Sequence, residues 1–201
     1  LGLDSCFEDI DNPIDLFKKW FVKAEETEIN DPNAVAVATS NKQNQPNVRM
    51  VLLKGLSDKG FVFYTNFNSK KGSELKVNQK ASMCFHWKSI RRQVRVIGKV
   101  EEVTAKEADE YYNSRPYKNR ISAWASSQSE VLDKRDTFFS RIKEFEKKYP
   151  DQNNVPRPPY WSGWRVLPDE VEFWVDGEGR VHERLNYKKN NGKWEKELLY
   201  P

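Results

Sequence analysis

Apolar residues recur with two different periods along the chain, and the change of period separates helix from strand. Over residues 13–26 they repeat every three or four positions, and Asp11-Asn12-Pro13 supplies a cap followed by proline at the first helical position. We therefore predict a helix at 13–26 with one buried face. From Ala34 the period changes to that of a strand.

The remaining pattern predicts strands with helices inserted between them. Strands are expected at 34–39, 48–54, 61–65, 81–87, 91–103, 161–167, 171–175 and 181–187, with 194–199 as a further candidate. Helices are expected at 69–77, 104–115, 119–127 and 133–149, the last with a buried stripe of Phe138, Ile142, Phe145 and Tyr149. Mostly antiparallel neighbours predict an α+β fold built on a mainly antiparallel β-barrel. The segment after the proline-rich stretch 153–159 is too short to fold alone, so 1–201 is expected to be a single domain.

The stretch 49–72 is the most unusual part of the pattern. Two strands joined by a tight turn run into a helix start that carries Lys70 and Lys71 in its first turn. Lysines at a helix N-terminus oppose the helix dipole, so an anion is expected beside them, although a solvated basic loop is an open alternative. Strict alternation places Arg49 and Lys54 on opposite faces of their strand, so they serve different groups unless a bulge realigns them.

Two further groups of polar residues are candidates for chemistry. Tyr111 and Arg115 are four positions apart on a helix and project from the same side. Arg180, His182 and Arg184 alternate, so one strand face would bear three potential cations. Such crowding is unfavourable without an anion or an electron-rich ring opposite. A purely structural role for His182 stays open.

Composition narrows the range of partners. The formal net charge is +4 with 32% charged residues, too mild for a nucleic-acid surface but compatible with a local basic pocket for a small phosphorylated ligand. Cys6 and Cys84 form no disulfide framework, and Cys84 is expected to be a buried free thiol. No apolar run reaches membrane-spanning length and no signal peptide or glycosylation sequon is visible, so we expect a cytoplasmic protein without membrane partners. The sequence begins at Leu1 rather than Met, which leaves open what precedes it.

Few side chains are able to do bond-breaking chemistry unaided. His86 and His182 have no further ligand at metal-binding spacing, and no nucleophile, Walker or dinucleotide motif is present. We therefore expect no metal site. Any redox chemistry would have to come from a bound cofactor.

A series of short motifs occurs in a fixed order from residue 49 to the last residue. They are Arg49-Met50-Val51-Leu52-Leu53-Lys54, Phe63-Tyr64-Thr65-Asn66, Ser69-Lys70-Lys71, Arg92-Gln93-Val94-Arg95, Ser114-Arg115-Pro116, Ala123-Trp124, Gln128-Ser129, Trp161-Ser162-Gly163, Glu172-Phe173-Trp174, Arg180-Val181-His182-Glu183-Arg184 and Leu199-Tyr200-Pro201. With these motifs in this order, the chain closely resembles the pyridoxine (pyridoxamine) 5′-phosphate oxidase family nearly end to end. Each motif alone is weak, whereas the ordered set is highly specific.

The resemblance implies a homodimeric split β-barrel that binds FMN at the subunit interface, with 1–30 as an N-terminal helical segment and 161–201 as strands that complete the site. Residues that would hold FMN by position are Arg49, Met50, Val51, Leu52, Tyr64, Thr65, Lys70, Lys71, Gln93, Gln128, Ser129, Trp174 and Arg184. Residues that would bind the substrate are Lys54, Tyr111, Arg115, Asn119, Arg180 and His182. Of these, Lys54, Tyr111 and Arg115 would grip the substrate phosphate.

The reaction implied by the resemblance is oxidation of pyridoxamine 5′-phosphate or pyridoxine 5′-phosphate to pyridoxal 5′-phosphate. A hydride would leave the 4′-carbon of the substrate for the flavin, and O2 would reoxidise the flavin with formation of H2O2. Arg180 and His182 are the expected catalytic residues. Arg180 would cover the free face of the pyridine ring, and His182 would help to orient the reacting group or its phosphate. The protein's own contribution is positioning and electrostatics.

The chain departs from the family pattern at five positions. Asn119 stands where a phosphate-binding Ser is usual, Val175 replaces Gln, and Glu183 replaces Asp. Ser122 and Ser162 replace common glycines. None of these changes removes a charge that the chemistry needs, but the effects of Asn119 and Val175 stay open.

Two alternatives of different kinds stay open beside the oxidase. One is a non-catalytic flavin- or pyridoxal-phosphate-binding protein, against which the intact Arg180 and His182 argue. The other is a related flavin oxidase with another substrate, as in phenazine synthesis. Lys54, Tyr111 and Arg115 argue against it, because together they favour a phosphorylated substrate.

Overall fold

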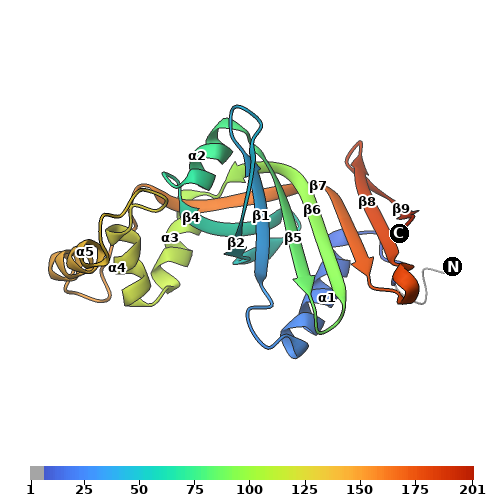
Figure 1. The fold of residues 1–201 in the computed structure, drawn as a ribbon, viewed down its shortest axis with the longest axis horizontal. Coiled ribbons are helices and arrows are strands. Elements are labelled where there is room, and N and C mark those ends of the chain that lie inside the picture. The colour runs from blue at the N-terminus through green and yellow to red at the C-terminus, as the bar shows by residue number, and fades with distance from the viewer. Residues whose placement is uncertain (1–6) are drawn as a thin grey trace.

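One antiparallel sheet runs through most of residues 7–201, the part of the chain that the computed structural model describes (Figure 1). Residues 1–6, with Cys6 and the start of the expected segment 1–30, lie outside the described residues. The strands are β1 (Ala34–Ser40), β2 (Pro46–Leu52), β3 (Gly55–Ser57), β4 (Gly60–Asn66), β5 (Lys80–Trp87), β6 (Arg92–Glu102), β7 (Trp161–Val175), β8 (Glu183–Asn190) and β9 (Lys193–Leu199). Their order is β2-β1-β5-β6-β7-β4-β3, and β8 and β9 extend the sheet from β7.

The helices lie around this sheet, and their ends follow local sequence signals. They are α1 (Pro13–Thr27), α2 (Lys70–Val77), α3 (Ala105–Ser114), α4 (Tyr117–Ala125) and α5 (Arg135–Lys148), with a short 3-10 turn at Glu178–Arg180. Thr104 and Glu107 cap α3 reciprocally, as the sequence predicts. Within residues 7–201, no helix has the length and apolar character needed to cross a membrane. The predicted α+β, mainly antiparallel fold is confirmed.

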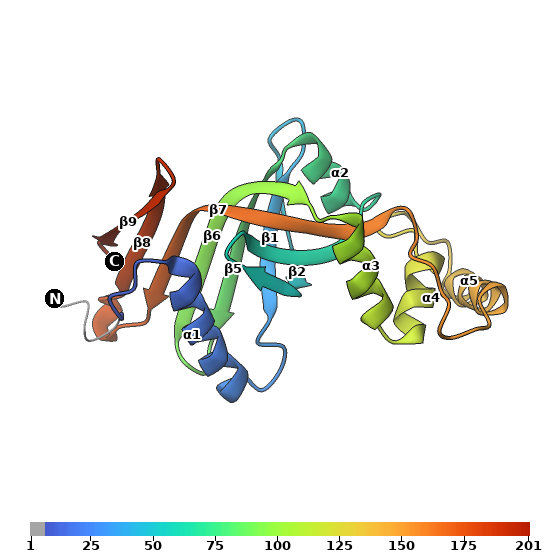
Figure 2. The same ribbon diagram turned by 180° about the vertical axis from the view of Figure 1, so that it is seen from behind.

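The core lies between α1 and the inner face of the curled sheet (Figure 2). Phe17 of α1 makes edge contacts with Phe61 and Phe85, each at a ring-centroid distance of 4.9 Å. One turn further on, Trp20 packs edge-on against Phe173 at 5.1 Å. The helical stripe predicted at 13–26 therefore packs against β4, β5 and β7, and burial of these large rings stabilises the curled sheet.

β7 is one continuous strand of 15 residues, whereas the pattern predicted two strands at 161–167 and 171–175. It pairs with β4 along its first part, with β8 along its last part and with β6 along most of its length. The expected break is only a register shift between β6 and β7: Ile97 pairs with Glu170 and Gly98 with Pro168, which leaves Asp169 as the extra residue on β7. Proline has no N–H to donate, and a bulge accommodates it without ending the strand. The two strands also approach closely, because a Cβ on Gly98 would lie 1.9 Å from the Leu167 carbonyl oxygen.

The predicted strand at 48–54 is wrong at its C-terminal end. β2 pairs with β1 and stops at residue 52, and the next two residues carry the chain across to β4. The Leu53 N–H donates to the carbonyl just before β1, while the Lys54 N–H donates to a carbonyl of β4, both at 2.8 Å. Strand alternation therefore does not extend to Lys54. The prediction that Arg49 and Lys54 lie on opposite faces of one strand fails for this reason.

The apolar stripe of α5 and the Cys84 side chain are less buried than the pattern predicts. The apolar stripe of α5 is only half-buried, since it packs on α4 at one end of the molecule rather than on the sheet (Figure 1). There Trp124 contacts Phe145 at 5.7 Å and Tyr149 at 5.4 Å between ring centroids. Cys84 is a free thiol, as predicted, but it is half-buried on the outer side of β5. Its partial burial raises the pKa of this thiol.

Replacing Gly98 by Ala should lower the free energy of unfolding by about 1–3 kcal/mol or more, because the added Cβ meets a backbone carbonyl at the register shift. Chemical denaturation measures this difference. Lys99→Ala, at the exposed next position of β6, is the control and should change the free energy by less than about 0.5 kcal/mol. Equal stability of the wild type and Gly98→Ala would show that the two strands need no close approach.

Candidate functional site

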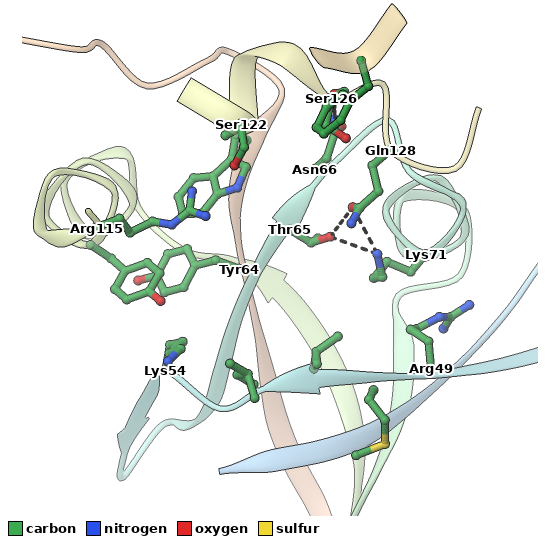
Figure 3. Close-up of a pocket in the computed structure, with 17 residues that line it drawn as sticks. Arg49, Lys54, Tyr64, Thr65, Asn66, Lys71, Arg115, Ser122, Ser126 and Gln128 are labelled. Atoms are coloured by element: carbon green, nitrogen blue, oxygen red, sulfur yellow. Dashed lines mark hydrogen bonds between the residues drawn. The ribbon is translucent and has the colours of Figure 1, made fainter. Parts of the chain in front are cut away.

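A cavity of about 540 Å³ opens where β2, β4 and the start of β7 meet α2, α3 and α4 (Figure 3). The 17 lining residues are Arg49, Met50, Val51, Leu52, Lys54, Tyr64, Thr65, Asn66, Lys71, Tyr111, Arg115, Ser122, Ala123, Ser126, Gln128, Phe138 and Trp161. Four of them are cations, and none is Asp or Glu. A partly enclosed lining of this kind favours an anionic ligand, because the cations repel one another until an anion neutralises them.

The four cations occupy two ends of the cavity (Figure 3). Arg49 from β2 and Lys71 from α2 lie at one end. Lys54, from the break between β2 and β3, and Arg115, from the end of α3, lie at the other. Tyr64 and its neighbours on β4 stand between the two ends. The arrangement suits two phosphate groups, each of which needs several charge-assisted donors.

Lys71 is the most buried of the four cations, with 8% of its surface exposed. Its Nζ lies 3.2 Å from both Thr65 Oγ1 and Gln128 Oε1, and 3.4 Å from Ser69 Oγ. All three partners are neutral, and within residues 7–201 no carboxylate forms an ion pair with Lys71. Burial, followed by the nearby charge of Arg49, lowers the pKa of Lys71. The ammonium group is therefore a buried donor that lacks a counter-ion.

The N-terminus of α2 explains why only one of the two predicted lysines reaches the cavity. Ser69 caps the helix, and its side chain accepts from the Gly72 N–H. Lys71 then points inward, while Lys70 is exposed and does not line the cavity. The open alternative of a solvated basic loop is wrong for Lys71, because its side chain is buried.

Arg49 is held from behind by a buried carboxylate. Its Nη1 donates to the Thr39 hydroxyl at 2.6 Å, and to the carbonyls of Val37 at 3.1 Å and Asn47 at 3.3 Å. Its Nη2 lies 3.4 Å from Glu74 Oε2. Glu74 is 5% exposed and also accepts from Thr39 at 2.5 Å and from Asn47 at 2.6 Å. Because Glu74 does not line the cavity, it holds the guanidinium from behind while Arg49 still lines the cavity.

Aromatic rings support the other end of the cavity. Tyr64 stacks on Tyr111 at a centroid distance of 4.1 Å, and burial raises the pKa of both phenols, so they remain donors. The Arg115 guanidinium lies 4.8 Å from the centroid of the Trp161 ring. Burial lowers the pKa of Arg115. As predicted from their spacing, Tyr111 and Arg115 reach the same cavity.

Eight residues that the sequence assigned to the site do not line this cavity. They are Lys70, Gln93, Asn119, Ser129, Trp174, Arg180, His182 and Arg184. Asn119 is exposed on α4, where its carbonyl accepts from the Ser122 hydroxyl at 3.0 Å, and Ser122 lines the cavity instead. Ser129 follows the lining residue Gln128 in a left-handed conformation, with φ of 75°.

Four of these eight residues form a second cluster on β6, β7 and the start of β8. The sheet register places Gln93 opposite Trp174, and Trp174 opposite Arg184. The His182 ring lies 4.7 Å from the Trp174 ring. The Arg184 Nε donates to Glu172 Oε1 at 2.9 Å. The chain therefore carries two groups of the expected site residues, and only one of them lies in the cavity.

Arg180, His182 and Arg184 do not share a strand face, so that prediction is wrong. The expected strand at 181–187 begins two residues later, and Arg180 is an exposed residue of the 3-10 turn with φ of 65°. The Gly177 N–H donates to His182 Nδ1 at 3.2 Å, which closes this turn. Because Arg180 lies in this turn and Arg184 lies in β8, strand alternation does not place the two side chains on one face.

Several residues of the cavity were not expected from the sequence. Asn66 and Trp161 belong to the ordered motifs, but the sequence analysis assigned neither of them a role in the site. Ser126 and Phe138 carry no such signal, because their place depends on how α4 and α5 pack. Within residues 7–201, no three His, Cys, Asp or Glu residues gather as a group that could hold a metal ion.

Two family models together match most of the chain. Residues 21–149 match the model described as pyridoxamine 5′-phosphate oxidase, and residues 161–201 match the one described as pyridoxine 5′-phosphate oxidase C-terminal dimerisation region. The chain is 58% identical to the pyridoxine/pyridoxamine 5′-phosphate oxidase of Pelagibacter ubique, with 100% of this chain and 97% of that protein covered. It is 53% identical to the protein of the same name from Sinorhizobium fredii, over 97% of this chain and 95% of that protein.

Solved structures share the fold. PhzG from Burkholderia lata, in complex with tetrahydrophenazine-1-carboxylic acid, superposes with a TM-score of 0.91 at 28% identity, over 96% of this chain and 95% of that chain. A pyridoxamine 5′-phosphate oxidase-related, FMN-binding protein from Nostoc punctiforme gives a TM-score of 0.74 at 16% identity, over 92% and 96%. The expected split-barrel fold is therefore confirmed.

Replacing Glu74 by Ala should lower the free energy of unfolding by about 2 kcal/mol or more, because it leaves the Arg49 charge and two polar side chains without their buried acceptor. Urea denaturation gives the value. Glu197→Ala removes the exposed ion pair with Lys188 and should cost less than about 1 kcal/mol. If the two variants were equally stable, Glu74 would not be needed as the buried acceptor of Arg49, and the prediction would be wrong.

Proposed function

The chain belongs to the pyridoxamine 5′-phosphate oxidase family, and on this premise we propose that the two ends of the cavity bind two phosphate groups, one from the cofactor and one from the substrate. The protein is an FMN-dependent oxidase that converts pyridoxine 5′-phosphate or pyridoxamine 5′-phosphate to pyridoxal 5′-phosphate, with O2 as electron acceptor. The observation that carries the assignment of the two ends is a lining with four cations and no carboxylate.

The end that contains Arg49 and Lys71 fits the phosphate of FMN. Lys71 is buried among neutral oxygens, so a dianion would supply the counter-charge that the chain itself does not provide. Met50, Val51, Leu52, Tyr64, Thr65 and Gln128 line the same cavity and would hold the rest of the cofactor. FMN, when bound, would supply the redox chemistry, with a hydride equivalent lost from the 4′-carbon and O2 reduced to H2O2; the amine substrate would also consume water and release ammonia.

The other end fits the substrate phosphate. Lys54 and Arg115 have no carboxylate partner within residues 7–201, and Tyr111 is held as a protonated donor by its buried environment. Tyr111 and Arg115 from α3, together with Lys54 from the break between β2 and β3, would fix the phosphate from two sides and so orient the 4′-carbon. Asn119 lies outside this end, and its role in substrate binding stays a prediction.

The protein forms a homodimer through its C-terminal region, and we propose that each cavity is completed by the second cluster of the other copy. Within one chain, none of Gln93, Trp174 and Arg184 lines the cavity, although all three were expected to hold FMN. The expected catalytic residues are His182, which belongs to that cluster, and Arg180, two positions before it, and both lie within the region 161–201. Residues 1–201 would then act as one FMN-binding unit whose C-terminal strands complete its partner's site.

An oxidase with another substrate is the nearest alternative, because PhzG shares the fold at 28% identity. The 58% identity over the full chain to a pyridoxine/pyridoxamine 5′-phosphate oxidase supports the phosphorylated vitamers instead. So do the cations at the substrate end of the cavity. The cytoplasmic location expected from the sequence stays a prediction, which cell fractionation would test.

A visible spectrum tests the whole assignment. The purified protein should show flavin absorbance, lose it on addition of pyridoxamine 5′-phosphate without O2, and regain it with O2 as pyridoxal 5′-phosphate and H2O2 appear. A colourless protein without affinity for FMN would contradict the assignment. A flavin that binds but is not reduced by either vitamer would favour the non-catalytic binding protein.

Replacing Lys71 by Ala should raise the dissociation constant of FMN by about 10- to 100-fold, because a buried charge-assisted donor is lost. The quenching of FMN fluorescence measures this constant. Since burial lowers the pKa of Lys71, and an anion binds its protonated form, wild-type affinity should fall as pH rises through that pKa. Lys70→Ala changes the neighbouring lysine, which is exposed and does not line the cavity, and it is the control for the FMN-binding measurement. Lys54→Ala should leave FMN binding within about threefold and raise the KM for the substrate instead.

Arg180→Leu should depress kcat strongly while FMN stays bound, and a mixed dimer tests where Arg180 acts. Each chain would carry one change, Arg180→Leu or Lys71→Ala, and at an FMN concentration that saturates the wild type but not Lys71→Ala, both homodimers should be nearly inactive. If Arg180 acts in the cavity of the other copy, one site of each mixed dimer is intact, and random mixing should restore about a quarter of wild-type activity. No recovery on mixing would place Arg180 in the site of its own chain.

A further inference from the structure

Trp161, the first residue of β7, contacts several site side chains at once. It is 6% exposed. Its ring lies nearly parallel to those of Tyr64, at 5.3 Å, and Tyr111, at 6.1 Å, and Tyr112 packs edge-on against it at 5.2 Å. The Arg115 guanidinium lies 4.8 Å from its ring centroid. One side chain therefore touches both Tyr111 and Arg115, two of the three residues proposed for the substrate phosphate.

Arg115, which is partly buried, is held differently from Arg165, a buried arginine of β7. Arg165 pairs with two carboxylates, Glu101 and Glu107, which satisfy its charge. Within residues 7–201, no carboxylate pairs with Arg115, and its Nη1 is buried without a hydrogen-bond partner. Its charged group rests instead on the face of Trp161. An aromatic face stabilises a guanidinium without supplying an anion.

We propose that Trp161 is a positioning residue for the substrate phosphate and thereby sets the preference for phosphorylated vitamers. Its ring takes the place beside the partly buried Arg115 guanidinium that a carboxylate could otherwise have, so the Arg115 charge stays available to the phosphate. The unpaired Nη1 is the donor that the phosphate satisfies. This inference rests on the proposed function, in which Arg115 binds the substrate phosphate.

The contacts of Trp161 separate this role from ordinary core packing. Trp164, three residues further along β7, is 1% exposed and stacks on Phe67 at 4.8 Å, but it does not line the cavity. A change at Trp164 affects packing alone. A change at Trp161 affects packing and also the support of Arg115 and Tyr111. The two residues form a matched pair for experiment.

The test compares steady-state kinetics of the FMN-loaded dimer. Trp161→Met should raise the KM for pyridoxine 5′-phosphate by about tenfold with kcat within about threefold, since the loss concerns binding of the phosphate. Trp161→Phe keeps a ring and should give an intermediate KM, which also serves if the Met variant does not fold. Trp164→Phe is the packing control and should leave KM within about twofold. An unchanged KM in the Trp161 variants would overturn the proposal.

A double-mutant cycle shows whether Trp161 acts through Arg115. In an Arg115→Met background, Trp161→Met should change the KM by less than about twofold, because the guanidinium that the ring supports is already absent. A further tenfold loss in that background would mean that the two effects are independent. Trp161 would then be a structural residue only, and the proposal would be wrong.

Failure of the oxidase assignment itself would be distinguishable from failure of this proposal. A wild-type protein without oxidase activity would contradict the proposed function and leave no KM to measure. The same variants are then compared by calorimetric titration of pyridoxine 5′-phosphate into the protein. An affinity about tenfold weaker in Trp161→Met, with no such loss in the Arg115→Met background, supports the role of Trp161. Equal affinities contradict it.

Discussion

Positive charge without a lining carboxylate is the constraint on which this site depends. For three of the four cations of the cavity, the supporting group either is neutral or lies outside the cavity lining. Arg49 has a carboxylate behind it, Lys71 has hydroxyl and amide oxygens, and Arg115 has an aromatic face. These supports belong to different helices and strands. The fold must therefore hold them in place before a ligand arrives, which is what makes the site pre-organised for an anion.

The curled sheet meets this requirement through two irregular features. The break at residues 53–54 moves the chain from the β1 side to the β4 side, so that β2 and Lys54 contribute to the same cavity. The register shift beside Gly98 lets β7 continue as one strand from the cavity to the second cluster. An ideal sheet with strict alternation would have neither feature, and it would not bring the two cationic ends together in one cavity.

Features set by a few neighbouring residues could be predicted from the sequence, and features set by distant contacts could not. The caps at Ser69 and Thr104 depend on residues within four positions, and both are where the pattern placed them. The turn at Arg180 breaks an alternation that looks regular in the sequence. The roles of Glu74 and Trp161 depend on which side chains the folded sheet brings against them, so their own sequence context gave no sign of them.

β7 carries Trp161 at its first position and Trp174 thirteen residues later, or roughly 40 Å of extended chain. Trp161 lines the cavity of its own chain, whereas Trp174 belongs to the cluster outside it. Under the proposed arrangement, each strand of the dimer reaches into both sites, and neither copy contains a complete one. The number of working sites is then set by the assembly equilibrium, so dilution below the dissociation constant of the dimer would remove both sites together.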